Sequence, residues 1–262
     1  MTRLAFVSTA HIHTKGFIEA LVSGEAEGVV HTVWDDVPDR GRRYAEQAGC
    51  GFTADLQAVV EDPAVDAFVV CAENTRHLPL LERLLPRGKP VFCEKPLATS
   101  ADDARTIARL QQRYGTPLLS GYFLPFDAPM RAAGAALREQ RFGRLTHLTY
   151  RNAHHAAYGL WFDGPDVRWF TDPALAGGGA LMDMGTHAVH ALLTLAGPVT
   201  SVWASTANVT GQYPEVDDYG VIQLRFASGV LGRAEAGWCF TGGFRGLEAV
   251  CAEATLYQSR DG

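Results

Sequence analysis

The 262-residue sequence predicts an α/β protein with two domains. Three observations support this class. Apolar strand-like runs alternate with helix-like segments up to residue 121, which indicates a doubly wound parallel sheet. The run 67–71 is continuously apolar, as expected of a central strand covered on both faces. Beyond residue 122, strand-like runs follow one another without helices, which predicts an α+β domain with a largely antiparallel open sheet. The expected domains are 1–121 and 122–262.

In the first domain each predicted strand except the last is followed by a helix, and turn signals separate them. Pro38 at a helix start, Gly49 at its end and Ser100 as a cap mark helix boundaries. Such repeats favour right-handed crossovers. The expected strands are 4–7, 28–34, 67–71, 90–93 and 117–121, and the expected helices are 17–22, 38–48, 55–61, 77–85 and 101–114.

The second domain is predicted to combine two helices with an antiparallel sheet. One helix is expected at 129–140 and another after the triple glycine 177–179. Ser228-Gly229 is typical of a hairpin turn. The expected strands are 145–152, 199–206, 219–226, 230–237 and 247–256, and residues 260–262 read as a strand end.

Composition narrows the function classes. The net charge of -6 and the lack of a basic run argue against a nucleic-acid binder. No apolar run reaches transmembrane length, and the N-terminus lacks signal-peptide features, so we expect no membrane partner. The five cysteines are scattered without a CxxC pair, which favours a reducing cytoplasm and predicts no metal site.

The stretch from Gly177 to His187, GGGALMDMGTH, predicts a tight loop that leads into a buried helix. Asp183 and His187 are spaced one helical turn apart, so a carboxylate and an imidazole could act on one small molecule. The alternative is a helix with an N-terminal acid and a core histidine. The helix alone does not decide between these interpretations.

A doubly wound sheet binds its ligand at the carboxyl ends of its strands. Asp35 ends the second strand, where an acid can accept hydrogen bonds from an adenosine ribose and repel a 2′-phosphate, so NAD is the expected cofactor. The alternative is a solvated loop acid. Arg40, early in the next helix, leaves NADP as an alternative cofactor because it could contact a 2′-phosphate.

The loop after the first strand departs from the dinucleotide fingerprint. Ser8, Ala10 and His13 occupy the GxGxxG positions. Ser8 and Ala10 are small, but His13 is harder to accommodate. Either the loop still presents N–H groups at a helix N-terminus, or cofactor binding is weak or absent. His11 and His13 could add positive charge near a phosphate, or could simply be solvated.

Glu94-Lys95-Pro96 follows an apolar strand, and proline keeps this lysine out of a regular ladder. Together with GGGALMDMGTH, this triplet resembles the glucose–fructose oxidoreductase, inositol dehydrogenase and rhizopine catabolism (Gfo/Idh/MocA) family. Residues 73–77 (ENTRH) and 169–173 (WFTDP) also resemble family segments. The resemblance implies a Rossmann domain and a C-terminal α+β domain whose open sheet forms a homo-dimer or homo-tetramer.

The resemblance also implies NAD(P)-dependent hydride transfer at a secondary alcohol of a sugar or cyclitol, with Lys95, Asp183 and His187 as the catalytic group. We expect His187 to act as base, Lys95 to bond the developing alkoxide and Asp183 to hold hydroxyls. The candidate cofactor-binding residues are Ser8, Ala10, His11, Ile12, Asp35, Ala72, Glu73, Asn74, His77, Glu94 and Lys95, and the candidate substrate residues are Tyr122, His154 and Trp169, with His155 and Tyr158 as further aromatic candidates.

Three departures leave alternatives open. The first loop lacks glycines, His190 stands where the family often has aspartate, and the family usually continues beyond residue 262. One alternative uses NAD only transiently, in a hydrolysis or elimination. Another is a non-enzymatic regulator that senses a ligand. The degraded loop favours the regulator, whereas the intact Lys95, Asp183 and His187 favour the enzyme.

Overall fold

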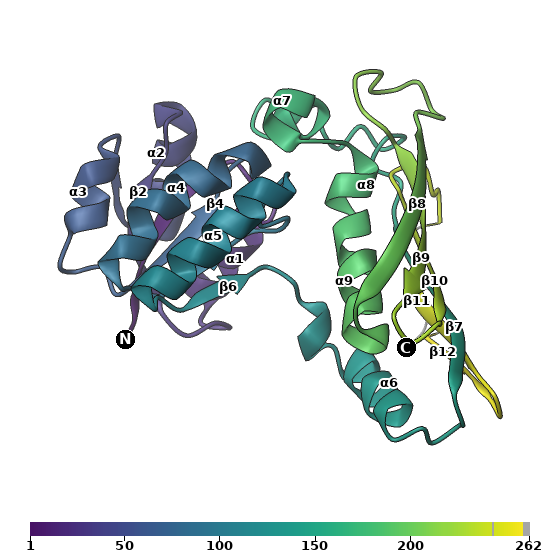
Figure 1. Cartoon of the computed structure of the whole chain (residues 1–262). Helices are drawn as coiled ribbons and strands as arrows, with labels where there is room; N and C mark the ends of the chain where they lie inside the picture. Colours follow the sequence, from purple (N-terminus) through teal and green to yellow (C-terminus); the bar gives the residue numbers. More distant parts are fainter. Residues whose placement is uncertain (243, 259–262) are drawn as a thin grey trace. The chain divides into compact units, whose positions relative to one another are not determined.

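The computed structural model describes residues 1–242 and 244–258 (Figure 1). It divides into two compact units, which are described separately below. The first unit contains Met1–Gly121, Gly164–Phe170 and Ala174–Gly177, and the second contains Tyr122–Asp163, Thr171–Pro173 and the chain from Gly178 onward. The expected strand end at residues 260–262 lies outside the described residues.

The sheet of the first unit confirms the predicted doubly wound class. Its order is β3-β2-β1-β4-β5-β6 and all its pairs are parallel, so the strand order reverses between β1 and β4. The short strand β3 was not predicted. The strands are β1 (Arg3–Thr9), β2 (Val29–Trp34), β3 (Gly51–Thr53), β4 (Ala67–Cys71), β5 (Val91–Cys93) and β6 (Leu118–Ser120).

Helices cover both faces of this sheet because successive residues of β1 point to opposite sides. Val7 packs with Leu81 of α4 and Ile107 of α5 in one core cluster, whereas Phe6 packs with Ile18 of α1 in another. The α-helices are α1 (Thr14–Ser23), α2 (Pro38–Ala48), α3 (Leu56–Glu61), α4 (His77–Leu84) and α5 (Ala101–Tyr114), and the 3₁₀ turns are η1 (Asn74–Arg76) and η2 (Leu85–Arg87).

The sheet of the second unit has the order β12-β11-β7-β10-β9-β8. It is mostly antiparallel, as predicted, but β7 and β10 pair in parallel. The predicted single strand 247–256 is wrong, because the chain turns at 252–254 and forms two antiparallel strands. The strands are β7 (Leu145–Ala153), β8 (Val199–Ala207), β9 (Tyr219–Phe226), β10 (Leu231–Gly237), β11 (Phe244–Cys251) and β12 (Thr255–Tyr257).

In Figure 1, α9 lies along one face of this sheet. Its Leu192 packs with Tyr150 of β7 and Leu224 of β9 in the core of the second unit, to which α6 contributes Met130. The predicted helix after the triple glycine is interrupted at Met184. The helices of this unit are η3 (Leu124–Phe126), α6 (Ala128–Arg138), α8 (Ala180–Asp183) and α9 (Gly185–Ala196), whereas η4 (Arg168–Thr171) and α7 (Pro173–Ala176) consist mainly of residues of the first unit.

Candidate active site

The first loop joins β1 to α1 at the point where the strand order reverses. Ser8 has φ 65°, a left-handed conformation that glycine adopts more readily and that marks the first position of the expected fingerprint. The N–H of His11 donates to the carbonyl of Cys71 (2.8 Å), and the N–H of His13 donates to Nδ1 of His11 (3.2 Å). Contacts within the first unit therefore fix the backbone of this loop.

Asp35, after β2, is fully buried and its carboxylate is saturated with protein donors. Arg40 donates from Nε (2.9 Å) and Nη2 (2.8 Å), Thr9 from its N–H (2.8 Å) and hydroxyl (2.5 Å), and Val37 from its N–H (2.8 Å). Burial alone would raise the pKa of Asp35, but the Arg40 hydrogen bonds and charge outweigh it, so this pKa lies below its ordinary value. A ribose hydroxyl would therefore compete with these donors, and the predicted ribose contact of Asp35 remains a prediction.

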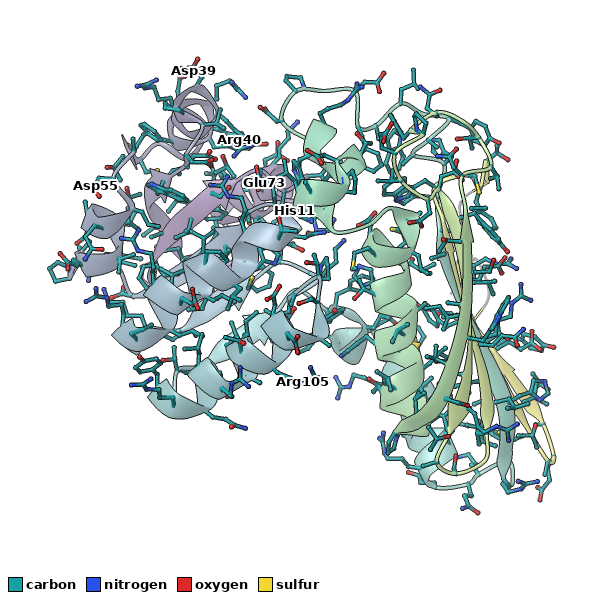
Figure 2. All side chains as sticks on the ribbon, turned by 45° about the horizontal axis from the view of Figure 1, so that its top comes forward. His11, Asp39, Arg40, Asp55, Glu73 and Arg105 are labelled. Carbon is teal, nitrogen blue, oxygen red and sulfur yellow. The ribbon has the colours of Figure 1, made fainter. Side chains whose placement is uncertain are left out.

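Arg40 links this carboxylate to the end of β4. Its Nη1 lies 3.5 Å from Oε1 of Glu73, and Figure 2 shows Arg40, Glu73 and His11 at the same end of the sheet. Arg76 continues the network outward, because it pairs with Asp36 and lies 3.4 Å from Oε2 of Glu73. The sequence analysis did not predict that Asp36 and Arg76 belong to this network, although the pair of acidic residues at the end of β2 could have indicated a cationic partner.

The predicted segment after β4 is tied to the loop after β5. Buried His77 places Nδ1 2.9 Å from the carbonyl of Pro96 and Nε2 3.2 Å from that of Ala72. Burial lowers the pKa of His77, which favours the neutral ring. Asn74 donates from Nδ2 to the carbonyl of Ala176 (2.9 Å). These two residues therefore connect loops, and direct cofactor contact by either remains a prediction.

Glu94 and Lys95 are both buried at the end of β5. Oε2 of Glu94 accepts from the N–H of Lys95 (2.9 Å), and Oε1 lies 3.0 Å from Nδ1 of His13. Gly121 leaves room for this carboxylate, because a Cβ there would meet Oε2 at 3.1 Å. The Glu94-Lys95 loop is thus joined directly to the first loop.

Trp169 also supports the first loop. Its Nε1 donates to the carbonyl of Ala10 (3.0 Å), and its ring stacks on Phe170 with centroids 3.9 Å apart. Phe170 in turn lies 5.4 Å from the ring of His11. The predicted substrate contact of Trp169 remains a prediction, whereas its contact with the loop backbone was not anticipated.

In the second unit, Asp217 fixes the start of α8. Its carboxylate accepts from the N–H groups of Gly179 (3.0 Å) and Leu181 (2.8 Å), which satisfies donors that a helix start leaves unpaired. A Cβ on Gly179 would lie 2.0 Å from the carbonyl oxygen of Asp217, so glycine is required by close approach. Asp183 ends this helix, and its Oδ2 accepts from Nε1 of fully buried Trp238 (3.0 Å).

His187 is buried in the first turn of α9, between aromatic rings. The ring centroids of Phe123 and Tyr122 lie 5.1 and 5.9 Å from it. Tyr122 pairs with the hydroxyl of Thr186 (2.6 Å) and stacks on His190 (4.4 Å), whose pKa is lowered by burial. The second unit therefore brings Tyr122 and His187 together, whereas the ring of His154 lies against Trp161 instead.

Two family profiles match the chain. "Oxidoreductase family, NAD-binding Rossmann fold" matches residues 3–122, and the "GFO/IDH/MocA C-terminal domain" matches residues 130–257. The chain belongs to the Gfo/Idh/MocA family. Its first unit is therefore the NAD-binding Rossmann domain of that family. No helix in the described part of the chain has the length and apolarity needed to cross a bilayer.

Relatives of this chain carry the names of reductases and dehydrogenases of sugars. The chain is 28% identical to a 1,5-anhydro-D-fructose reductase of Ensifer adhaerens, with 78% of this chain and 60% of the relative covered. It is 27% identical to a D-xylose 1-dehydrogenase (NADP(+)) of Haloferax volcanii, covering 88% and 67%. The structure of GenD2 from gentamicin A biosynthesis, in complex with NAD, matches with TM-score 0.85 and 25% identity over 98% of this chain and 72% of GenD2. The chain thus spans about 60% of the length of the first of these relatives.

Proposed function

We propose that this protein is an NAD(P)-dependent oxidoreductase that transfers hydride between the nicotinamide and a secondary alcohol or ketone of a sugar, cyclitol or sugar derivative. The observation that carries the proposal is the reversal of strand order between β1 and β4 in a domain that matches the NAD-binding Rossmann fold. Dinucleotides bind at such a switch point. The reductase and dehydrogenase names of the relatives support the substrate class.

The first loop fits a pyrophosphate in spite of its missing glycines. Ser8 takes the left-handed conformation expected at the first glycine, and Ala10 is small. The N–H of exposed Ile12 takes part in no hydrogen bond within the described residues, so it is available to a phosphate just before α1. When bound, the nicotinamide supplies the hydride acceptor or donor. We favour NAD because the Asp35 carboxylate neutralises Arg40 and leaves it less able to bind a 2′-phosphate.

Three residues of this chain are proposed to act on the substrate. His187 takes the hydroxyl proton as the alcohol is oxidised, and Lys95 donates a hydrogen bond to the developing alkoxide. Asp183 binds substrate hydroxyls through its carboxylate. Trp238 supports that role, because its N–H holds Oδ2 of Asp183 in a fixed direction. Restricting the side chain in this way lowers the entropy cost of orienting the substrate.

The test is to screen sugars and cyclitols with NAD and NADP for absorbance of the reduced nicotinamide. Replacing Lys95 or His187 by Ala should lower kcat on the best substrate by about 10²- to 10⁴-fold, the usual contribution of a positioned acid or base. His147→Ala, an exposed histidine on β7, is the matched control and should retain wild-type turnover.

Two results would overturn the proposal. Nucleotide binding without turnover of any substrate would favour a ligand-sensing regulator. Substrate conversion without net NADH would favour transient use of the nucleotide in a hydrolysis or elimination.

We also propose a cytoplasmic homo-dimer or homo-tetramer assembled through the sheet of the second unit. Trp203 of β8 is 57% exposed and Tyr257 of β12 is 71% exposed. The register places Trp203 opposite Gln223 and then Arg233, so its row runs across the face not covered by α9. Exposed aromatic residues of this kind are typical of interfaces.

Sedimentation of the Trp203→Glu variant tests this assembly. A buried glutamate would oppose association, so the variant should shift toward monomer while wild type stays oligomeric. Val22→Glu, at an apolar position on α1 that is also exposed, should leave the assembly unchanged. Monomeric wild-type protein at micromolar concentration would contradict the proposal.

A further inference from the structure

The first loop carries two histidines that the proposed hydride transfer does not use. His11 and His13 lie beside Glu94, and their three ligand atoms are all within 4.8 Å of one another. Nε2 of His11 lies 3.7 Å from Oε2 of Glu94, and Nδ1 of His13 lies 3.0 Å from Oε1. No other group of three potential ligands gathers in this way in the described part of the chain.

The spacing suits a small metal ion. A tetrahedral ion with ligand bonds of about 2.0–2.1 Å needs ligand atoms roughly 3.3 Å apart. The two distances to Glu94 lie on either side of this value. The ligand atoms of His11, His13 and Glu94, which all lie within 4.8 Å of one another, would move closer together on binding one ion.

The chemistry of the donors selects the class of metal. Two imidazoles and one carboxylate match divalent zinc and related first-row transition metals, whereas magnesium and calcium prefer oxygen ligands alone. Three protein ligands leave a coordination position open. The side chain of His13 is 49% exposed, so an ion could enter from solvent, whereas His11 and Glu94 are buried and fixed.

Surrounding residues hold the ligands in place. The N–H of Lys95 donates to Oε2 of Glu94, and the rings of Phe170 and Phe17 pack near His11 and His13. Coordination through Nε2 would place the proton of His11 on Nδ1. That costs the hydrogen bond from the N–H of His13, which at 3.2 Å is at the long end of the normal range.

From this arrangement we infer that His11, His13 and Glu94 form a binding site for a divalent first-row transition metal, with zinc as the probe ion. The sequence prediction of no metal site rested on cysteine spacing. It considered His11 and His13 only as positive charge near a phosphate and not as metal ligands, because Glu94 lies 81 residues from His13 and is brought to it only by the order of the parallel strands.

Calorimetric titration of the full chain with zinc chloride, after treatment with EDTA and without nucleotide, tests the site. We expect a single zinc ion per chain, and at least about 100-fold weaker binding in His13→Ala, since even indirect support of a metal ligand is worth 10- to 100-fold. His13 is half exposed, so this variant should fold normally. Leaving out nucleotide separates this result from the success or failure of the proposed hydride transfer.

His31→Ala is the matched control. His31 also lies 3.0 Å from a carboxylate, that of Asp62, but among the described residues no second imidazole joins this pair, so its loss should leave zinc affinity unchanged. Cobalt substitution gives a second readout. Wild type should show visible bands of a low-coordinate site without the near-ultraviolet band of a thiolate ligand, and His13→Ala should lose them.

Unchanged zinc affinity in His13→Ala would overturn the inference. So would no zinc binding to wild type, or a thiolate signature that placed the cobalt on cysteine.

Discussion

Asp35 and Glu94 are both buried carboxylates at the carboxyl edge of the Rossmann sheet, but different groups stabilise them. Asp35 accepts two hydrogen bonds from Arg40, a cation that keeps its proton at any ordinary pH. Glu94 instead faces the rings of His11 and His13, whose nitrogens can also bind a metal.

The difference shows which parts of this edge are rigid. The guanidinium closes the Asp35 site and joins β2, α2 and the end of β4 in one network. The imidazoles beside Glu94 can bind another partner in its place, and His13 makes this site accessible to solvent. We therefore expect Asp35 to act mainly on stability and Glu94 mainly on ligand binding.

Removing Arg40 should have the largest effect. Arg40→Ala leaves the Asp35 carboxylate buried without its cation, which should lower the free energy of unfolding by about 3–5 kcal/mol. Urea unfolding at neutral pH measures this change. Arg42→Ala on the same helix is the control, because Arg42 and its partner Asp39 are exposed, and its effect should stay within about 0.5 kcal/mol.

Acid titration checks the same pair independently. The folded-state pKa of Asp35 is lowered, so its contribution is complete above the unfolded value of about 3.9 and is lost as the pH falls toward the folded value. Wild type should therefore lose stability more steeply below about pH 3.9 than Arg40→Ala. Equal slopes, or equal stabilities at neutral pH, would show that Arg40 does not stabilise Asp35.

Much of the fold could be predicted because the spacing of apolar residues along the chain depends on which face of each helix or strand is buried. The continuous apolar run 67–71 identified a central strand, and strand and helix spacing identified the parallel sheet. The turn that separates β11 from β12 was missed because residues 252–254 are Ala-Glu-Ala, with none of the usual turn residues. The contact that fixes the start of α8 was missed because Asp217 is remote in sequence from Gly179.

The motifs of the candidate site could be predicted from the sequence, but the contacts between its residues could not. Motif resemblance selected Lys95, Asp183 and His187, and their catalytic roles remain predictions. The contact of Trp169 with Ala10 joins residues 159 apart, and that of Trp238 with Asp183 joins residues 55 apart. Local patterns carry no information on such pairs. The pairing of Asp35 with Arg40 is different, because the two are five residues apart and local inspection could have proposed it.

The smallest expected effect is at Glu94. Glu94→Gln removes the negative charge but retains a carbonyl that can accept from the N–H of Lys95, and His13 can move its ring proton to the other nitrogen. The variant should therefore lose only about 1 kcal/mol, the net value of a hydrogen bond.

Urea unfolding in the presence of EDTA measures this change without a contribution from bound metal. Arg40→Ala in the same buffer provides the comparison. If Glu94→Gln cost as much as Arg40→Ala, the Glu94 carboxylate would be as firmly paired as that of Asp35. The two carboxylates, Asp35 and Glu94, would then not differ in the way proposed above.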